Sequence, residues 1–313
     1  MAIETFLREL PHGITLSCRA AGPRGAPVLM FLHGFPEGAF VWDELMLHFA
    51  DPAHGGFRCI APNLRGFERS SQPPEPSAYR ARWLVQDIAA LIAAEAGDAP
   101  LHALVAHDWG GAVAWSLANQ QPGLLQRLAI VNSPHPGTFL RELRSNPGQQ
   151  AASAYMNFLI RPDAEALLAE DDFARLWPFF TAMGAGRDEG AGGPRPEGAG
   201  WLTDEVKERY RAVWRHGLTG GCNYYRASPL RPPREGDAGA LGVELPDAML
   251  RVEVPTLVLW GTGDTALPPE LVDGLEAWVP KLTLHRLEGA THWLIHEQPA
   301  RVAGLLGEFV RAG

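Results

Sequence analysis

Asp108 occupies the point where an expected buried strand turns sharply into a helix. Residues 101–106 form a short apolar run with the length of a buried strand, and the good helix formers from Ala112 onward predict a helix. Small residues surround Asp108 in the pattern Ala-x-Asp-x-Gly-Gly at 106–111. This pattern is typical of a strained strand-to-helix turn that holds one nucleophilic side chain out above a sheet. Here the side chain is a carboxylate, and an ordinary helix N-cap is the alternative that this stretch alone leaves open.

Two further turns that follow expected strands carry an acid and a base. Asp264 follows the apolar run 255–260, and His292 follows the run 281–287. The turns after the strands of a wound sheet meet at its carboxyl edge, so these side chains are expected to come together. Asp108, Asp264 and His292 stand in the order nucleophile, acid, base, with a carboxylate in place of the usual serine.

Other histidines compete with His292 for the role of base. His285 lies within the last expected strand and His296 at the start of a helix, whereas His292 lies in a loop from which it can reach Asp108. Taken singly, a histidine here is more often a surface or core residue, and Asp264 suits a turn by itself. The three positions together favour a catalytic triad.

The turn after the apolar run 28–32 is expected to stabilise negative charge. Acyl chemistry needs backbone N–H groups aimed at a developing oxyanion, taken from the residue after the nucleophile and from the loop after an earlier strand. Trp109 and Phe35 occupy those positions. Pro36 cannot donate a hydrogen bond, and the sequence leaves the isomer of the Phe35–Pro36 bond open. An aromatic-proline turn that only packs the core is the alternative.

An alternating series of strands and helices is expected to hold these turns. After two opening strands at 5–8 and 14–19, amphipathic helices such as 81–96 and 299–311 alternate with expected strands at 28–32, 57–61, 101–106, 128–132, 255–260 and 281–287. This alternation predicts an α/β protein with a mainly parallel, right-handed wound sheet and helices on both faces.

The alternation breaks in the middle of the chain. We expect residues 1–137 and 250–313 to form the α/β core and residues 138–249 to form an inserted cap that is helical and aromatic. Two stretches of this cap, 184–200 and 229–242, are rich in glycine or proline and lack helix or strand patterning. We expect both to be mobile surface loops.

Composition limits the partners of the chain. No apolar run among its 313 residues approaches the ~18 residues that a membrane span needs, so no membrane association is expected. The first residues lack an export signal, and Cys18, Cys59 and Cys222 lack disulfide or metal-ligand spacing, so we expect a cytoplasmic protein. A formal charge of −9 argues against a nucleic-acid partner. Whether the chain forms a homo-oligomer is left open.

The chain resembles the epoxide hydrolases of the α/β-hydrolase fold over nearly its whole length. His-Gly-Phe-Pro at 33–36 is similar to the oxyanion motif of that family, and His-Asp-Trp-Gly-Gly at 107–111 is similar to its nucleophile motif. Asp264 and His292 stand where its acid and base belong. The resemblance implies the α/β-hydrolase fold, an epoxide and water as reactants, Phe35, Pro36 and Trp109 beside the substrate, and no metal or organic cofactor.

Two cap segments add to the resemblance. Tyr-Met-Asn-Phe at 155–158 and Asn-Tyr-Tyr-Arg at 223–226 resemble the segments in which the family carries its ring-opening tyrosines. This implies that Tyr155 and Tyr225 donate to the epoxide oxygen, and Tyr224 remains as the other candidate. An aromatic cap that only needs packing is the alternative. Glu68 stands where the family more often has glycine, and we expect it to alter that loop without touching the chemistry.

Two other functions remain to be weighed against epoxide hydrolysis. A hydrolytic dehalogenase shares the Asp nucleophile and His base, but haloalkane dehalogenases usually carry Asn where Phe35 stands. Haloacid dehalogenases of this fold carry arginines at the places of Trp109 and Ala112. A non-catalytic binding protein on a hydrolase scaffold predicts the loss of at least one chemical position, and none is lost. A serine esterase is excluded because Asp108 replaces the serine.

Overall fold

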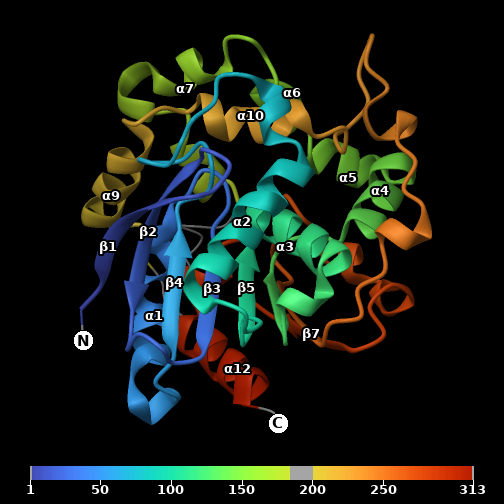
Figure 1. The fold of residues 1–313 in the computed structure, drawn as a ribbon. Coiled ribbons are helices and arrows are strands. Elements are labelled where there is room, and N and C mark those ends of the chain that lie inside the picture. The colour runs from blue at the N-terminus through green and yellow to red at the C-terminus, as the bar shows by residue number, and fades with distance from the viewer. Residues whose placement is uncertain (1, 184–199, 312–313) are drawn as a thin grey trace, which may run out of the picture.

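The computed structural model describes residues 2–183 and 200–311, which fold around one eight-stranded sheet (Figure 1). The strand order is β1-β2-β4-β3-β5-β6-β7-β8. β2 pairs antiparallel with β1 and β4, and every other neighbouring pair is parallel. The predicted mainly parallel wound sheet is therefore confirmed. The strands are β1 Glu4–Glu9, β2 Thr15–Ala21, β3 Val28–Leu32, β4 Arg58–Pro62, β5 Ala103–His107, β6 Leu128–Val131, β7 Thr256–Gly261 and β8 Leu282–Leu287.

Helices cover both faces of this sheet, as predicted. One hydrophobic cluster packs α1 (Asp43–Ala50) and α12 (Pro299–Arg311) on one face, and α2 (Ala81–Ala96) and α3 (Asp108–Gln120) contact each other on the opposite face. Every residue of β3 and β5 is buried, because these central strands are covered on both sides.

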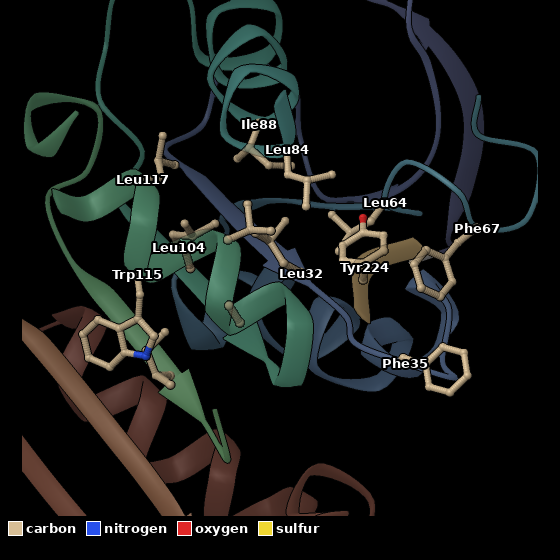
Figure 2. Packing of buried hydrophobic residues seen from close by; sticks show 14 of the residues in the cluster. Leu32, Phe35, Leu64, Phe67, Leu84, Ile88, Leu104, Trp115, Leu117 and Tyr224 are labelled. Carbon is tan, nitrogen blue, oxygen red and sulfur yellow. The ribbon is translucent and has the colours of Figure 1, made fainter. Parts of the chain in front are cut away.

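Figure 2 shows how the α2 face is packed. Leu84 and Ile88 of α2 point toward Leu32 of β3 and Leu104 of β5, and all four side chains belong to one core cluster. Burying a leucine or isoleucine side chain contributes about 1.5 to 3 kcal/mol. Such contacts fix the ends of β3 and β5, and it is at these ends that the site residues stand.

The regular secondary structure described between β6 and β7 is mainly helical, with loops joining the helices. In Figure 1, α6, α7, α9 and α10 lie over the end of the sheet toward which β4 and β5 point. Residues 184–199 of the first expected loop lie outside the described residues. The second contains a bridge between Arg234 and Asp237 and a short 3-10 helix at 239–242, so it is not wholly irregular. The helices are α4 Pro136–Ser145, α5 Pro147–Ala152, α6 Tyr155–Leu159, α7 Ala164–Phe173, α8 Trp177–Thr181, α9 Asp204–Trp214 and α10 Thr219–Ala227.

The turn at Asp108 is tighter than the sequence predicted. α3 begins at Asp108 itself, four residues before Ala112, and β5 runs from Ala103 to His107. Leu101 forms only an isolated bridge with Leu125. The strand and the helix can adjoin because Asp108 has a positive φ of 48°, which reverses the chain within a single residue.

Helix α10 is docked closely on the loop that follows β4. A Cβ atom at Gly220 would collide with the backbone of Gly66, so two backbones touch here. Next to this contact the Tyr224 hydroxyl donates to the main-chain oxygen of Arg65 at 3.0 Å. The Arg65 guanidinium is in turn paired with the buried carboxylate of Asp87 at 2.6 and 2.8 Å. The height of α10 above the sheet is thereby fixed.

None of the helices in the described ranges has both the length and the apolar character needed to cross a lipid bilayer.

Candidate active site

The Asp108 carboxylate stands at the carboxyl end of β5 with 13% of its side chain exposed. A positive φ costs an L-residue roughly 1 to 2 kcal/mol, and Asp tolerates it better than most. The hydroxyl of Ser133 donates to the main-chain oxygen of Asp108 at 2.6 Å and helps to hold the turn. A Cβ at Gly34 would collide with the Asp108 carboxylate, so only glycine leaves room for the side chain. The alternative role of Asp108 as an N-cap does not apply, because His107 occupies that position.

Backbone donors face this carboxylate from the turn after β3. The Phe35 N–H donates to Oδ1 of Asp108 at 2.7 Å. Trp109 is the second residue of α3, and the first N–H groups of a helix have no partner within the helix. The Phe35–Pro36 peptide bond, whose isomer the sequence left open, is cis. The structure thus places the Phe35 N–H on Asp108, and Trp109 directly follows Asp108 in α3.

His292 lies between the two aspartates. Its Nδ1 is 2.7 Å from Oδ2 of Asp264, and its Nε2 is 3.8 Å from Oδ2 of Asp108. Burial alone would lower the pKa of His292, but the carboxylates of Asp264, Asp108 and Glu37 raise it to about 9. His285 lies in β8, and His296 Nε2 contacts Glu37. Of the three candidate histidines, His292 is the one beside Asp108.

Asp264 is held by more partners than the sequence indicated. The backbone N–H groups of Ala266 and Leu267 donate to its Oδ1 at 2.9 and 2.8 Å. The side-chain amide of Asn132 donates to its Oδ2 at 2.7 Å. Asn132 directly follows β6, and Asp264 comes three residues after the end of β7. Asn132 is not titratable, so its residue type did not mark it as an acid or a base.

A second buried cluster, centred on Glu37, lies behind His292. His107 Nδ1 is 3.0 Å from Oε2 of Glu37, and His107 Nε2 is 3.0 Å from the main-chain oxygen of His292. The hydroxyl of Tyr210 donates to Oε1 of Glu37 at 2.9 Å, and Nε2 of His296 lies 2.9 Å from the same oxygen. Burial alone would raise the pKa of Glu37, but hydrogen bonds from the two histidines hold it below its ordinary value. The sequence pattern indicated no role for Glu37 or for His107.

The cap places Tyr155 and Tyr225 above Asp108. Their ring centroids are 6.0 Å apart, and Tyr225 also contacts the rings of Phe35 and Trp109 edge to face at 5.5 and 5.1 Å. Burial, together with the nearby charge of Asp108, raises the pKa of both phenols above the ordinary tyrosine value. Both therefore remain protonated and can act as donors.

The Tyr224 ring contacts Trp109 with a centroid distance of 5.5 Å and lines the same cavity as Asp108, but its hydroxyl is bound elsewhere. Its hydroxyl is hydrogen-bonded to the main-chain oxygen of Arg65, on the side of the loop that follows β4. Successive helical residues point about 100° apart, so Tyr224 and Tyr225 on α10 could not both face the same carboxylate. Figure 2 shows Tyr224 near Leu64, within the core cluster.

A cavity of about 380 Å³ opens beside Asp108, a volume typical of small-molecule sites. Tyr155, Trp109 and Ser133 line it together with Asp108, whereas Tyr225 and His292 do not contribute to its described walls. Within the described ranges, no group of three or more His, Cys, Asp or Glu residues is arranged to hold a metal ion.

Comparison with known proteins agrees with this geometry. The family described as alpha/beta hydrolase fold matches residues 27–299. The chain is 33% identical to AB hydrolase superfamily protein YfhM of Bacillus subtilis (strain 168), over 96% of each chain. It is 30% identical to epoxide hydrolase 4 of Mus musculus, over 98% of this chain and 79% of that protein. The chain belongs to the epoxide hydrolase family of the α/β-hydrolase fold.

Solved structures of epoxide hydrolases superpose over the whole chain. One, from metagenomes of hot environments, has a TM-score of 0.82 and 36% identity and covers 100% of both chains. The Bacillus megaterium epoxide hydrolase in complex with an inhibitor has a TM-score of 0.81 and 29% identity, and covers 97% of this chain and 99% of its own. Membership of this family rather than of the dehalogenases is what the sequence resemblance predicted.

Proposed function

We propose that this epoxide hydrolase family member converts an epoxide to a vicinal diol through an ester on Asp108. The observation that carries the proposal is the position of the Asp108 carboxylate, which has the Phe35 N–H on Oδ1 and the His292 imidazole facing Oδ2. One oxygen is therefore bound by a donor suited to an oxyanion, and the other faces a base. In such a mechanism one carboxylate oxygen is alkylated, and the other must be stabilised when it becomes the oxyanion during ester hydrolysis.

In the first step, Oδ2 of Asp108 attacks one carbon of the epoxide. The new bond joins that oxygen to the carbon, and the carbon–oxygen bond of the ring breaks. The ring oxygen takes a proton from Tyr155 or Tyr225, which are protonated because burial raises the pKa of each phenol. The product of this step is a hydroxyalkyl ester of Asp108.

In the second step, His292 takes a proton from water, and the water oxygen attacks Cγ of Asp108. Negative charge collects on Oδ1, which already accepts from the Phe35 N–H. The Trp109 N–H is the second donor in this proposal, and each such donor typically contributes roughly 3 to 4 kcal/mol. The bond between Cγ and Oδ2 then breaks, and Oδ2 leaves in the diol with the proton that His292 took from water. Asp108 keeps the water oxygen, and the remaining proton of the water passes from its carboxyl group to the tyrosine phenolate, which restores the enzyme.

Ester formation also changes the state of the base. While Asp108 is ionised, its charge helps to raise the pKa of His292 to about 9, which keeps the imidazole protonated. The ester is neutral, so this contribution disappears and the imidazole loses its proton more readily. The base thus becomes available in the step that needs it.

Two measurements test the proposal. With styrene oxide in oxygen-18 water, repeated turnover should place label in the peptide that contains Asp108, and His292→Gln should accumulate that peptide with the mass of the epoxide added. Diol formation by the native enzyme without label in Asp108 would rule out the covalent route. Absence of diol with terminal, aryl and fatty epoxides alike would reject the activity itself.

A further inference from the structure

Among the described residues, the walls of the cavity beside Asp108 run along α3 and do not include Phe35 or Phe179. We propose that the enzyme selects epoxides with a single long apolar substituent, and that Phe179 excludes a substituent on the other ring carbon. This inference rests on the proposed function and specifies its substrate class.

The open side of the site follows helix α3. Asp108, Ala112, Ser116 and Gln120 all line the cavity, and their spacing of four places them on one stripe of the helix. At a rise of 1.5 Å per residue, this stripe is about 18 Å long. A substituent that begins at the epoxide can therefore lie along α3 for most of its length.

The part of the cavity that runs along α3, here called the arm, has walls that suit an apolar chain. Facing α3 are hydrophobic side chains from four separate parts of the fold: Phe139, Met156, Leu245, Met249 and Leu267. Among the described residues that line the cavity, the charged ones are Asp108 and, at an exposed position before α2, Arg80. Apolar area in such an arm contributes about 25 cal/mol per Å² removed from water.

A group of packed aromatic rings adjoins the site. Phe179 of α8 packs edge to face against Phe35 and against Tyr155, each with a centroid distance of 5.8 Å. Phe35 in turn packs against Tyr225 at 5.5 Å. Neither Phe35 nor Phe179 belongs to the described walls of the cavity. A second substituent on the epoxide would have to displace these rings, and inserting a bulky group into packed side chains is unfavourable.

Among these rings, Phe179 is the one that can be changed without altering the proposed chemistry. Phe35 supplies the N–H on Asp108, and Tyr155 and Tyr225 are the proposed proton donors. Phe179 is partly exposed on a short cap helix and contacts them only through its ring. Its truncation should therefore open space on the closed side of the site.

The isomers 1,2-epoxydecane and trans-5,6-epoxydecane test this inference, because they have the same formula and differ in whether one or both ring carbons carry a chain. We expect kcat/KM for the 1,2-isomer to exceed that for the 5,6-isomer by at least about tenfold. Phe179→Ala should lower this ratio at least about fivefold by raising turnover of the 5,6-isomer. Phe158→Ala, which removes a ring of the same size from α6, should leave the ratio unchanged.

A second variant tests the arm and does not depend on Phe179. The Ser116 hydroxyl donates to the main-chain oxygen of Ala112 one turn earlier, so a larger side chain at position 116 extends into the cavity without breaking a contact between elements. Ser116→Phe should lower kcat/KM for 1,2-epoxydecane at least about tenfold relative to 1,2-epoxybutane.

The outcomes distinguish the proposed substrate selectivity from the proposed epoxide hydrolysis. Equal turnover of the two epoxydecanes, or an unchanged ratio in folded Phe179→Ala, would overturn the one-sided site while leaving epoxide hydrolysis standing. If Phe179→Ala does not fold, Phe179→Leu gives the same comparison. Absence of diol from every epoxide would instead reject the proposed function.

Discussion

The side-chain amide of Asn132 donates to Oδ2 of Asp264 at 2.7 Å, the same oxygen that lies 2.7 Å from Nδ1 of His292. The other oxygen of Asp264 accepts two backbone N–H groups. The carboxylate is thus fixed on both sides, and through it an uncharged residue at the end of β6 sets the orientation of the imidazole that faces Asp108.

Asn132→Gly should slow epoxide turnover. Glycine accepts the φ of 40° at this position, so the change removes the amide without adding backbone strain. We expect kcat to fall by about 10- to 100-fold, because His292 is then less well oriented. Steady-state diol formation measures the effect. Asn146→Gly, at the N-cap of α5, serves as the control and should leave kcat unchanged.

Breakdown of the ester should depend on pH. His292 must be neutral to accept a proton from water, and its pKa of about 9 in the free enzyme falls when Asp108 loses its charge. The rate of ester hydrolysis should therefore rise with pH and level off at an apparent pKa below about 9. Rapid-quench measurement of the Asp108 ester during single turnover checks this. A rate that does not change between about pH 6 and about pH 9 would contradict the role of His292 as the base.

Glu37→Gln should affect both stability and the pH profile. Glu37 is fully buried and accepts from Tyr210 while facing two histidines, so loss of its charge should lower the free energy of unfolding by about 2 to 3 kcal/mol. Its charge also helps to raise the pKa of His292, so ester hydrolysis should level off at a lower pH. Urea denaturation and the same rapid-quench profile test the two effects. An unchanged profile would show that Glu37 acts on stability alone.

Gly34→Ala should abolish most activity while the fold persists. A Cβ at this position would occupy the space of the Asp108 carboxylate, which would be forced away from the Phe35 N–H. We expect kcat/KM to fall more than about 100-fold. Gly123→Ala is the matched control, because a Cβ there meets no atom within 4 Å, and it should retain activity. Thermal denaturation of both variants confirms that they fold.

Glu68 shows how a departure from the family pattern is accommodated. Its φ is 49°, a conformation that glycine adopts without cost, which gives a physical reason for glycine at this place in relatives. The Glu68 carboxylate compensates by accepting from Asn63 at 3.1 Å and from the N–H of Arg69 at 3.0 Å. The loop is therefore held by a side chain that the sequence alone marked only as unusual.

The turns of Asp108, Asp264 and His292 could be predicted from the sequence because each follows a segment with strand patterning, and the segments before Asp108 and Asp264 are apolar enough for buried strands. Parallel strands present their carboxyl ends at one edge, so residues in such turns are brought together whatever lies between them. The helix boundary at Asp108 could not be predicted, because propensity placed the helix start at Ala112 and the strained φ is imposed by the surrounding packing.

The sequence left both Tyr224 and Tyr225 as candidates for the second proton donor. Two adjacent tyrosines on a helix cannot be told apart by residue type. The close docking of Gly220 on Gly66 brings the Tyr224 hydroxyl to the main-chain oxygen of Arg65, which leaves Tyr225 as the candidate donor. The partners of Glu37 come from α9, α11 (Leu294–Glu297) and the end of β5, and no local pattern links them.

By itself, the amino-acid sequence predicted the candidate residues for the chemistry and their order along the chain, because strand periodicity and turn composition are local properties. The tertiary structure decided which side chains face one another across separate elements. Contacts such as that of Asn132 with Asp264, or of Phe179 with Phe35, depend on how distant segments pack, and packing is a property of the whole fold.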